Sequence, residues 1–287
     1  MPRPRPDALA LGARYRIALP TVVRGGLAGE QLGKGTGASL EFEDRRAYVP
    51  GDDVRHLDWR AFARTDSLQV RVYREEIVPQ LDLLVDASAS MAVDDAKGQF
   101  LADLVGLLVE SGRHGALDVR IVVVGERPER LDAARLVSAG IACRGRHSLV
   151  EFLPATLALL RPRSMAVVVS DFLFPHAPAD LVRPILARSG PLALVQLLGA
   201  GDATPAAGAA HRLVDAESGA TLDVVLDART VARYVERRAR LSEELAHECR
   251  RGGAIWASLV VPELLDGALD HACRHELVPR GVVAPAD

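Results

Sequence analysis

LDLLVDASAS, the stretch from Leu81 to Ser90, decides the fold because an apolar run ends there in small polar residues. The run Leu81 to Val85 predicts a strand that is buried on both faces, as in parallel sheets covered by helices. Open α/β sheets bind their ligands at the carboxyl ends of such strands. Asp86, Ser88 and Ser90 therefore mark a candidate site directly after the first core strand.

Short apolar runs alternate with amphipathic stretches of helical length along the rest of the chain. This order is typical of an α/β fold, a mostly parallel sheet flanked by helices. A long charged helix over Ala228 to Arg251 precedes the last strand. The other strands are expected at Leu68 to Tyr73, Val119 to Val124, Ala166 to Val169, Leu192 to Leu198 and Ile255 to Val260, and the other helices near Trp59 to Ala63, Ala96 to Ser111, Val150 to Leu160 and Leu181 to Ala187.

Composition divides the chain into three segments. The first begins with a basic, proline-rich run and lacks the apolar core of a secretory signal, so it is expected to be a disordered lead-in. The second combines glycine clusters with dense mixed charge and is expected to be a polar module. The segments are residues 1–25, 26–78 and 79–287, and the third is the α/β domain, with an edge insertion that contains a hairpin at about 199–225.

Bulk properties exclude several classes of protein. The 287 residues, 49% of them hydrophobic, suffice for a large core, and no apolar run approaches the roughly 18 residues that span a bilayer. Three widely spaced cysteines form neither a disulfide framework nor a CxxC metal motif, which favours a reducing cytoplasm. The net charge of -3 argues against general nucleic-acid binding. The basic residues are almost all Arg, with only Lys34 and Lys97 as lysines, which is typical of a GC-rich bacterial genome.

The polar residues after the strands suggest a cation site. Asp86, Ser88 and Ser90 alternate in a loop, so three oxygen side chains can turn toward one point, as hard cations such as Mg²⁺ require. Asp171 ends a later strand at the same sheet edge, because parallel strands share that edge. Ser148, placed to cap a helix, offers a further hydroxyl. The alternative is that the small polar residues after the first strand only cap the next helix.

The polar module contains a run of acids, arginines and aromatics from Tyr48 to Trp59. Its Asp52, Asp53 and Arg55 are candidates for a partner-binding surface. The favoured alternative is that charged side chains form hydrogen-bonded pairs that fix the module to the α/β domain. These side chains are Arg45, Arg55, Arg64, Asp53 and Asp58. Gly33 to Gly37 lacks the residue order of a phosphate-binding loop, so nucleotide binding is not expected.

The residues of the candidate site resemble the metal-ion-dependent adhesion site of von Willebrand factor A domains, which consists of DxSxS, a later hydroxyl and a later Asp. Asp86 to Ser90, Ser148 and Asp171 take these places. Nearly the whole chain also resembles the bacterial family called domain of unknown function 58, or DUF58. The residues that carry this resemblance are Glu41-Phe42, Arg45, Tyr48, Gly51-Asp52-Asp53, Arg55, Leu57-Asp58-Trp59, Ala63-Arg64, Val70-Arg71, the DxSxSM from Asp86 to Met91, and Leu213-Val214-Asp215 with Ser218-Gly219.

The resemblance implies a Rossmann-like, von Willebrand factor A-type sheet and a bound divalent cation, Mg²⁺ first and Mn²⁺ or Ca²⁺ next. Ser88, Ser90 and Ser148 would touch the ion directly, while Asp86 and Asp171 would act partly through water. An acidic side chain from a protein partner would complete the coordination shell. The implied partner is a MoxR-type AAA+ ATPase, a class thought to act as chaperones, or a client of that ATPase.

One departure from the adhesion site concerns the later hydroxyl. Adhesion sites usually place Thr after a glycine pair, whereas Ser148 here follows Gly145-Arg146-His147. Arg146 or His147 would weaken cation binding by repulsion or would meet the carboxylate of the partner directly. A metal-free site is therefore the alternative to a cation site.

The expected function is a non-catalytic, metal-assisted protein-binding adaptor in the cytoplasm, which works with a MoxR-type ATPase in chaperone-like assembly or activation of other proteins. The alternative is a serine-dependent hydrolase that uses Ser88 or Ser90, served by a histidine such as His147. The chain has no GxSxG elbow after a strand, and no histidine has a position that predicts contact with either serine. The sequence therefore favours binding over catalysis.

Overall fold

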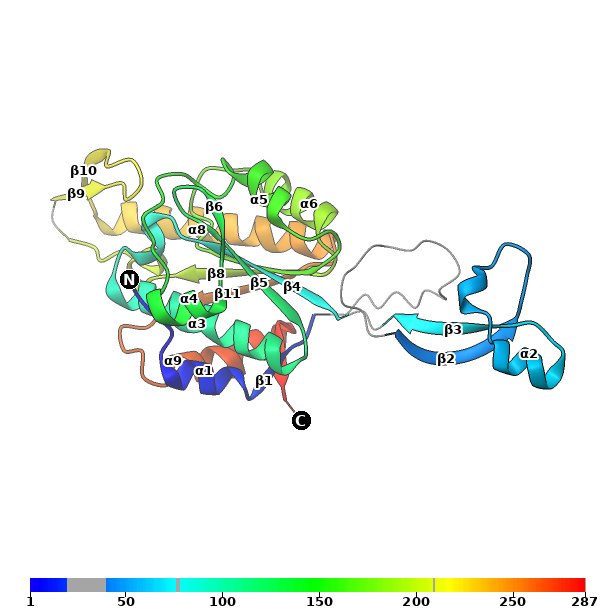
Figure 1. Cartoon of the computed structure of the whole chain (residues 1–287). Coiled ribbons are helices and arrows are strands. Elements are labelled where there is room, and N and C mark those ends of the chain that lie inside the picture. The colour runs from blue at the N-terminus through cyan, green and yellow to red at the C-terminus, as the bar shows by residue number, and fades with distance from the viewer. Residues whose placement is uncertain (20–39, 76–77, 209, 287) are drawn as a thin grey trace. The chain divides into compact units, whose positions relative to one another are not determined.

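A computed structural model of the chain describes residues 1–19, 40–75, 78–208 and 210–286. The chain divides into two compact units, one of Met1–Val22 with Pro79–Asp287 and one of Val23–Val78 (Figure 1). The glycine-rich stretch from Gly33 to Gly37 and residues 20–25 of the expected lead-in lie outside the described residues.

A six-stranded sheet forms the centre of the larger unit (Figure 1). Its strands, in spatial order, are β11 (Ile255–Val260), β8 (Leu192–Leu198), β7 (Met165–Ser170), β4 (Gln80–Asp86), β5 (Asp118–Val124) and β6 (Pro128–Leu131). Neighbouring strands are parallel except β6, which runs antiparallel to β5. The five parallel strands confirm the predicted ones to within one residue at each end. Strands β4 and β7 therefore end side by side, with Val85 opposite Val169.

Helices cover both faces of this sheet. Buried side chains alternate along β4, so that Leu83 and Val85 belong to one apolar core and Leu84 to the other. The first core is closed by α1 (Pro6–Gly12), α3 (Asp95–His114), α4 (Ala133–Ala139) and α9 (Ala268–Ala272), and the second by α5 (Leu153–Leu159), α6 (Pro178–Arg188) and α8 (Ala228–Arg251). The expected α/β class, a mostly parallel sheet flanked by helices, is confirmed.

The N-terminal segment packs on the larger unit, which differs from the expected disordered lead-in. Helix α1 lies so close to α3 that a β-carbon at Gly12 would fall 2.7 Å from the carbonyl oxygen of Leu107. Arg5 donates from its backbone N–H and from Nε to the fully buried carboxylate of Asp103, each at 2.8 Å. The proline and arginine content of this segment gave no sign of these long-range contacts. A short strand pair then joins the two ends of the unit, β1 (Tyr15–Ile17) with β12 (Val283–Pro285), beside η3 (Cys273–Leu277) and α10 (Val278–Arg280).

An antiparallel strand pair organises the described part of the smaller unit. Its elements are β2 (Leu40–Ala47), η1 (Val54–His56), α2 (Trp59–Thr65) and β3 (Gln69–Glu75). Helix α2 and strand β3 confirm the helix and the strand predicted from the sequence. Asp58 begins α2 as a capping residue, because its carboxylate accepts the N–H groups of Arg60 and Ala61, each at 3.1 Å.

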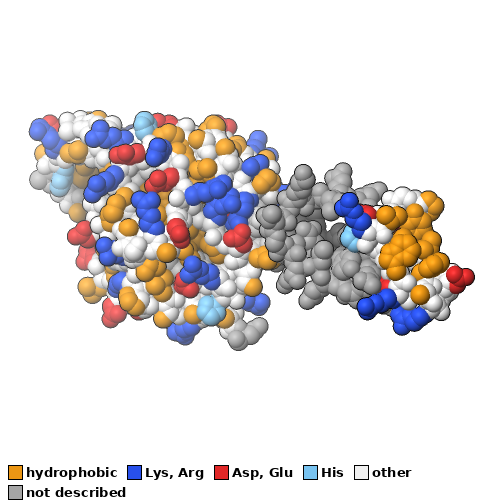
Figure 2. Space-filling model, viewed as in Figure 1, with side chains coloured by type: hydrophobic (Ala, Val, Ile, Leu, Met, Phe, Trp, Pro, Cys, Tyr) orange, Lys and Arg blue, Asp and Glu red, His pale blue; other side chains and the backbone are white. Residues whose placement is uncertain are grey.

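The predicted hairpin is present in the larger unit, after α7 (Ala200–Ala203), and consists of β9 (Ala210–Val214) and β10 (Thr221–Val225). Strand β6 was not predicted, because it is only four residues long, carries two charged residues and begins with Pro128, which suits only the edge of a sheet. Acidic and basic side chains are interspersed on the visible face of the larger unit (Figure 2). In the part of the chain that the structure describes, no helix has the length and apolar character needed to cross a membrane.

Gly106 tests whether the N-terminal segment covers α3. A β-carbon there would fall 2.6 Å from Cβ of Pro4 and 3.0 Å from Cδ2 of Leu9. Gly106→Ala should therefore destabilise the folded chain by about 1–3 kcal/mol, although the same change in an uncovered helix stabilises it by up to about 1 kcal/mol. Urea unfolding measures the sign, with Gly201→Ala as control because a β-carbon there meets nothing within 4 Å. Stabilisation by Gly106→Ala would contradict the observed packing.

Candidate functional site

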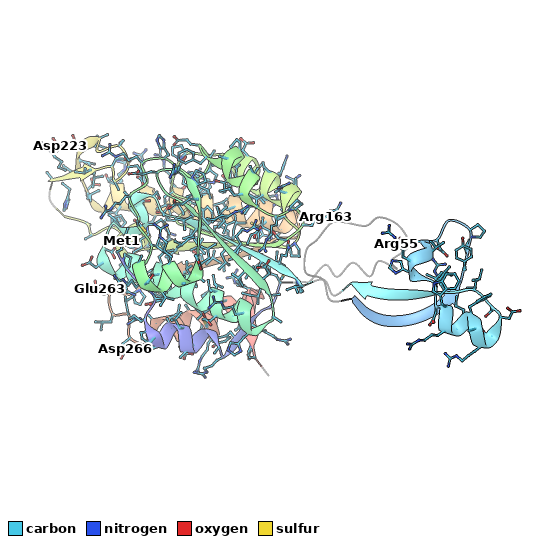
Figure 3. All side chains as sticks on the ribbon, in the orientation of Figure 1. Met1, Arg55, Arg163, Asp223, Glu263 and Asp266 are labelled. Atoms are coloured by element: carbon cyan, nitrogen blue, oxygen red, sulfur yellow. The ribbon has the colours of Figure 1, made fainter. Side chains whose placement is uncertain are left out.

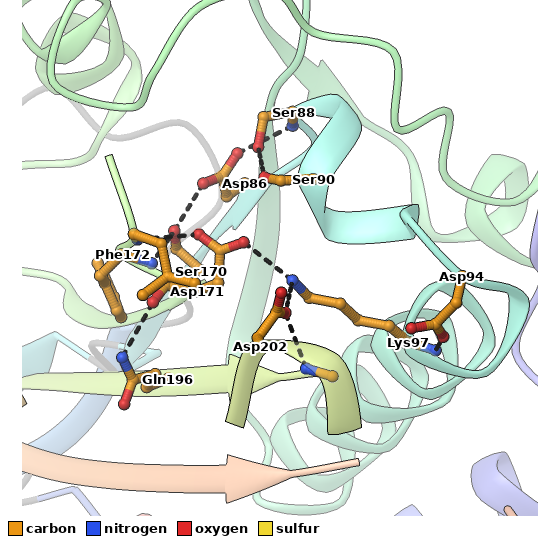
Figure 4. Close-up of polar contacts among 12 residues, drawn as sticks. Asp86, Ser88, Ser90, Asp94, Lys97, Ser170, Asp171, Phe172, Gln196 and Asp202 are labelled. Atoms are coloured by element: carbon orange, nitrogen blue, oxygen red, sulfur yellow. Dashed lines mark hydrogen bonds and ion pairs between the residues drawn. The ribbon is translucent and has the colours of Figure 1, made fainter. Parts of the chain in front are cut away.

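Asp86, the last residue of β4, carries an unfavourable negative charge. Only 1% of its surface is exposed. One carboxylate oxygen accepts the Ser88 N–H at 2.9 Å and the other accepts the Ser170 hydroxyl at 2.6 Å (Figure 4). Burial, and after it the negative charge of Asp171, raise the pKa of Asp86 to about 6, although these hydrogen bonds act in the opposite direction.

The two serines of the motif lie on a turn that a neighbouring loop holds in place. Ser88 precedes η2 (Ala89–Ala92), which contains Ser90, and the two hydroxyl oxygens are 3.1 Å apart. Backbone hydrogen bonds in both directions, each 3.0 Å long, tie this turn to Gly145. A β-carbon at Gly145 would fall 2.7 Å from the backbone carbonyl oxygen of Gly125, so the close approach of these two loops requires glycine at position 145.

Asp171 follows β7, the strand beside β4, and its charge acts on Asp86 as the sequence predicts for one shared edge. Its Oδ1 accepts the Leu173 N–H at 3.1 Å. Its backbone carbonyl accepts from Nε2 of Gln196, a fully buried side chain of β8, at 3.0 Å. Serine hydroxyls from α8 and β11 donate to Oε1 of the same Gln196 at 3.0 and 2.9 Å. The loop after β7 is therefore held rigidly by its neighbours.

Lys97, in the first turn of α3, brings a positive charge into the site. It is fully buried, and its Nζ donates to Oδ2 of Asp171 at 2.9 Å and to Oδ2 of Asp202 at 2.6 Å (Figure 4). Burial acts to lower the pKa of Lys97, but the two carboxylates outweigh it and the pKa is raised. No motif in the sequence predicts a role for Lys97 or Asp202. The available signal was that Lys97 is one of only two lysines among 35 basic residues.

The hydrogen bonds of Ser148 are made with Glu151. Its N–H and its hydroxyl donate to Oε1 of Glu151 at 3.1 and 3.0 Å, which is a capping box at the start of a turn. Among the described residues, Ser148 makes no hydrogen bond to the four oxygen-bearing side chains of the site. His147 also pairs with Glu151, at 2.8 Å, and Arg146 is exposed.

The candidate residues of the smaller unit have local structural roles. Asp52 accepts from Nη1 of Arg46 at 2.7 Å and from the Val49 N–H at 2.9 Å. Asp53 accepts the backbone N–H of Arg55 at 2.9 Å and so begins η1. These bonds lie within the smaller unit, and the expectation that charged pairs fix the module to the α/β domain stays a prediction.

The donor set of the larger unit fits a hard divalent cation. Asp86, Asp171, Ser88 and Ser90 offer carboxylate and hydroxyl oxygens, the donors that Mg²⁺ prefers. The described residues contain no group of three or more His, Cys, Asp or Glu side chains that could hold a metal. A cation in this site would therefore depend on the serine hydroxyls and on water as well as on the two carboxylates.

Comparison with known proteins gives the family. The family described as "Protein of unknown function DUF58" matches residues 44–244. The uncharacterized protein Rv1480 of Mycobacterium tuberculosis (strain H37Rv) is 31% identical over 263 aligned residues, which cover 82% of this chain and 79% of the relative. The chain belongs to the DUF58 family. The uncharacterized protein Mb1516 of Mycobacterium bovis matches the DUF58 chain to the same extent.

Two solved structures cover 68% of the DUF58 chain at 13% sequence identity. One is the conserved hypothetical protein BatB from Bacteroides thetaiotaomicron, with a TM-score of 0.39 and 96% of its own chain covered. The other is an aerotolerance-related membrane protein from Bacteroides fragilis, with a TM-score of 0.35 and 97% covered.

The raised pKa of Asp86 predicts how the DUF58 chain responds to pH in the absence of metal. The folded state binds this proton more tightly than the unfolded state does. The resulting stabilisation is complete below about pH 4 and is lost as the pH rises through about 6. Asp86→Asn should therefore stabilise the metal-free chain at about pH 8 by up to roughly 3 kcal/mol. Urea unfolding in chelator at about pH 5 and pH 8 measures this difference; a variant no more stable than the native chain at the higher pH would contradict it.

Lys97→Met should destabilise the DUF58 chain by about 3–5 kcal/mol, because the buried Asp171 and the partly buried Asp202 then lose their cation. Arg113→Met, on the same helix, removes an exposed ion pair with Glu110 and should cost less than about 1 kcal/mol. The free energies of unfolding of both variants, measured with urea, check this prediction. Equal losses would show that the buried ion pairs contribute no more than a surface pair.

Proposed function

We propose that this DUF58 chain is a non-catalytic, metal-assisted protein-binding adaptor whose larger unit is a von Willebrand factor A-type domain. The strand order β11-β8-β7-β4-β5-β6, in which β6 is antiparallel, supports the domain type. So does the DxSxS turn at the carboxyl end of β4, a central strand of the sheet, where α/β sheets bind ligands.

The buried carboxylate of Asp86 carries the proposal. Asp86 makes no ion pair with any described side chain, and burial and the charge of Asp171 raise its pKa to about 6. Its hydrogen-bond donors, the Ser170 hydroxyl and the Ser88 N–H, are neutral and cannot cancel its charge. A divalent cation at this position would cancel that charge, which is the physical reason for expecting one to bind.

Each side chain has a proposed role toward the cation. Ser88 and Ser90 would supply hydroxyl oxygens directly, and Asp86 and Asp171 would act directly or through water. Ser148 would become a ligand only after leaving its capping box with Glu151. Mg²⁺ is the proposed ion, with Mn²⁺ or Ca²⁺ as substitutes.

The proposed partner is a MoxR-type AAA+ ATPase or its client, and the proposed compartment is the cytoplasm. A carboxylate of the partner would complete the coordination shell. Arg146, which is exposed and directly follows the Gly145 that holds the serine turn, would attract such an acidic group. The three cysteines form no disulfide, which agrees with a reducing compartment.

Binding is preferred to hydrolysis because no histidine among the described residues is placed to activate either serine. The hydroxyls of Ser88 and Ser90 bond each other, and no histidine of the described chain bonds to them. The histidine considered from the sequence, His147, pairs with Glu151 instead. A serine nucleophile needs a base within hydrogen-bond reach.

Calorimetric titration of the chelator-stripped chain with Mg²⁺ and with Mn²⁺ tests the cation site. The native chain should bind, and Asp86→Asn should lose at least about tenfold in affinity because a charged ligand is gone. Asp95→Asn is the matched control, since Asp95 is an exposed acid in the first turn of α3 and should leave binding unchanged. A native chain that binds neither ion would refute the cation site.

The partner arm of the same experiment uses a purified MoxR-type ATPase. The metal-loaded native chain should bind it, and chelator or Asp86→Asn should weaken binding by at least about tenfold. Binding that neither treatment changes would mean that the cation site does not recognise the ATPase.

A further inference from the structure

The hairpin of β9 and β10 is exposed along almost its whole length. Its Asp223 and the Arg163 that precedes β7 lie at opposite ends of the larger unit (Figure 3). The hairpin is therefore at the end where β4 and β7 finish, which is the end of the candidate site. Every residue from 210 to 223 is exposed except Glu217, which is half-buried.

Glu217 reaches the serine turn. Its Oε1 accepts the backbone N–H of Ser90 at 3.0 Å, although the two residues are 127 positions apart in the sequence. Ser90 is one of the two motif serines, so this contact places a carboxylate of the chain itself beside the proposed cation ligands. The role derived above for the site does not use Glu217.

The hairpin turn presents Glu217 in a defined geometry. Asp215 accepts both the N–H and the hydroxyl of Ser218, each at 2.6 Å. Gly219 has a φ of +71°, a conformation that favours glycine. These bonds fix the turn without help from the site, so holding the Glu217 carboxylate against Ser90 costs little further entropy.

We propose that Glu217 is the site's own acidic ligand, which occupies the place that an acidic side chain of a protein partner takes, so that a partner must displace the hairpin to bind. This inference rests on the proposed function. The hairpin then competes with the partner for the same place. The partner must present a carboxylate on a segment that can replace the turn around Glu217.

Charge makes the cation and the hairpin depend on each other. Asp86 has no positive partner among the described side chains, and Lys97 faces Asp171 and Asp202. Glu217 adds one more carboxylate at the same end of the sheet, which is unfavourable without a cation and favourable with one. A bound cation should therefore strengthen docking of Glu217, and Glu217 should strengthen cation binding by the same factor.

The test compares the full chain with Glu217→Ala and with Glu263→Ala, an exposed acid of another loop. Hydrogen exchange at the Ser90 amide reports docking of the hairpin. Calorimetry with Mg²⁺ measures how much Glu217 contributes to cation affinity. Titration of the Mg²⁺-loaded proteins with acetate, a minimal carboxylate, measures whether the position proposed for the partner's carboxylate is accessible.

In Glu217→Ala, exchange at Ser90 should accelerate and Mg²⁺ affinity should fall by about fivefold or more. The Mg²⁺-loaded variant should also bind acetate at concentrations at which the native chain and Glu263→Ala do not. Mg²⁺ binding by the native chain with Ser90 exchange and acetate binding unchanged in Glu217→Ala would overturn this inference alone. A native chain that does not bind Mg²⁺ would overturn the proposed function and this inference together.

Discussion

The buried ammonium group of Lys97 is the interaction on which the geometry of the site depends. Its two carboxylate partners come from separate elements, Asp171 from the loop after β7 and Asp202 from α7 after β8. A charge without solvent is tolerated only with close partners, so helix α3 cannot move without leaving all three groups uncompensated. Because α3 begins directly after the turn of Ser88 and Ser90, the same ion pairs also determine where these hydroxyls lie relative to the strand ends.

The burial that stabilises the sheet also makes the negative charge of Asp86 unfavourable. Strand β4 is covered on both faces, and the residues from Leu81 to Ala87 are all buried, so no solvent reaches the end of the strand to hydrate a carboxylate. Lys97 does not neutralise the charge of Asp86, because its ammonium group already pairs with Asp171 and Asp202. One buried strand thus has two consequences. Its apolar residues decide the fold, and its last residue, Asp86, carries a buried negative charge that a cation would neutralise.

The sequence predicted those parts of the structure that local patterns encode. Apolar runs gave the five parallel strands, and the rule that parallel strands share an edge placed Asp171 near Asp86. The contacts of Lys97 with its two carboxylates, and of Glu217 with Ser90, join residues 74, 105 and 127 positions apart, and no local pattern predicts them. The case of Ser148 is different, since Ser148 and Glu151 form a capping-box pattern that is visible in the sequence and competes with a metal role.

The segment at about 199–225 contacts the site at two places. This segment interrupts the alternation of strands and helices. Its first part supplies Asp202, which binds Lys97, and its hairpin supplies Glu217, which binds Ser90. Tyr234 of α8 donates to the backbone carbonyl of Asp202 at 2.8 Å, so the first part is anchored to the body of the unit. The hairpin itself is exposed apart from Glu217 and Val224. Displacement of the hairpin would therefore uncover the serine turn while leaving the Lys97 ion pairs in place. The site could then exchange the Glu217 carboxylate for one from a partner and keep its own geometry.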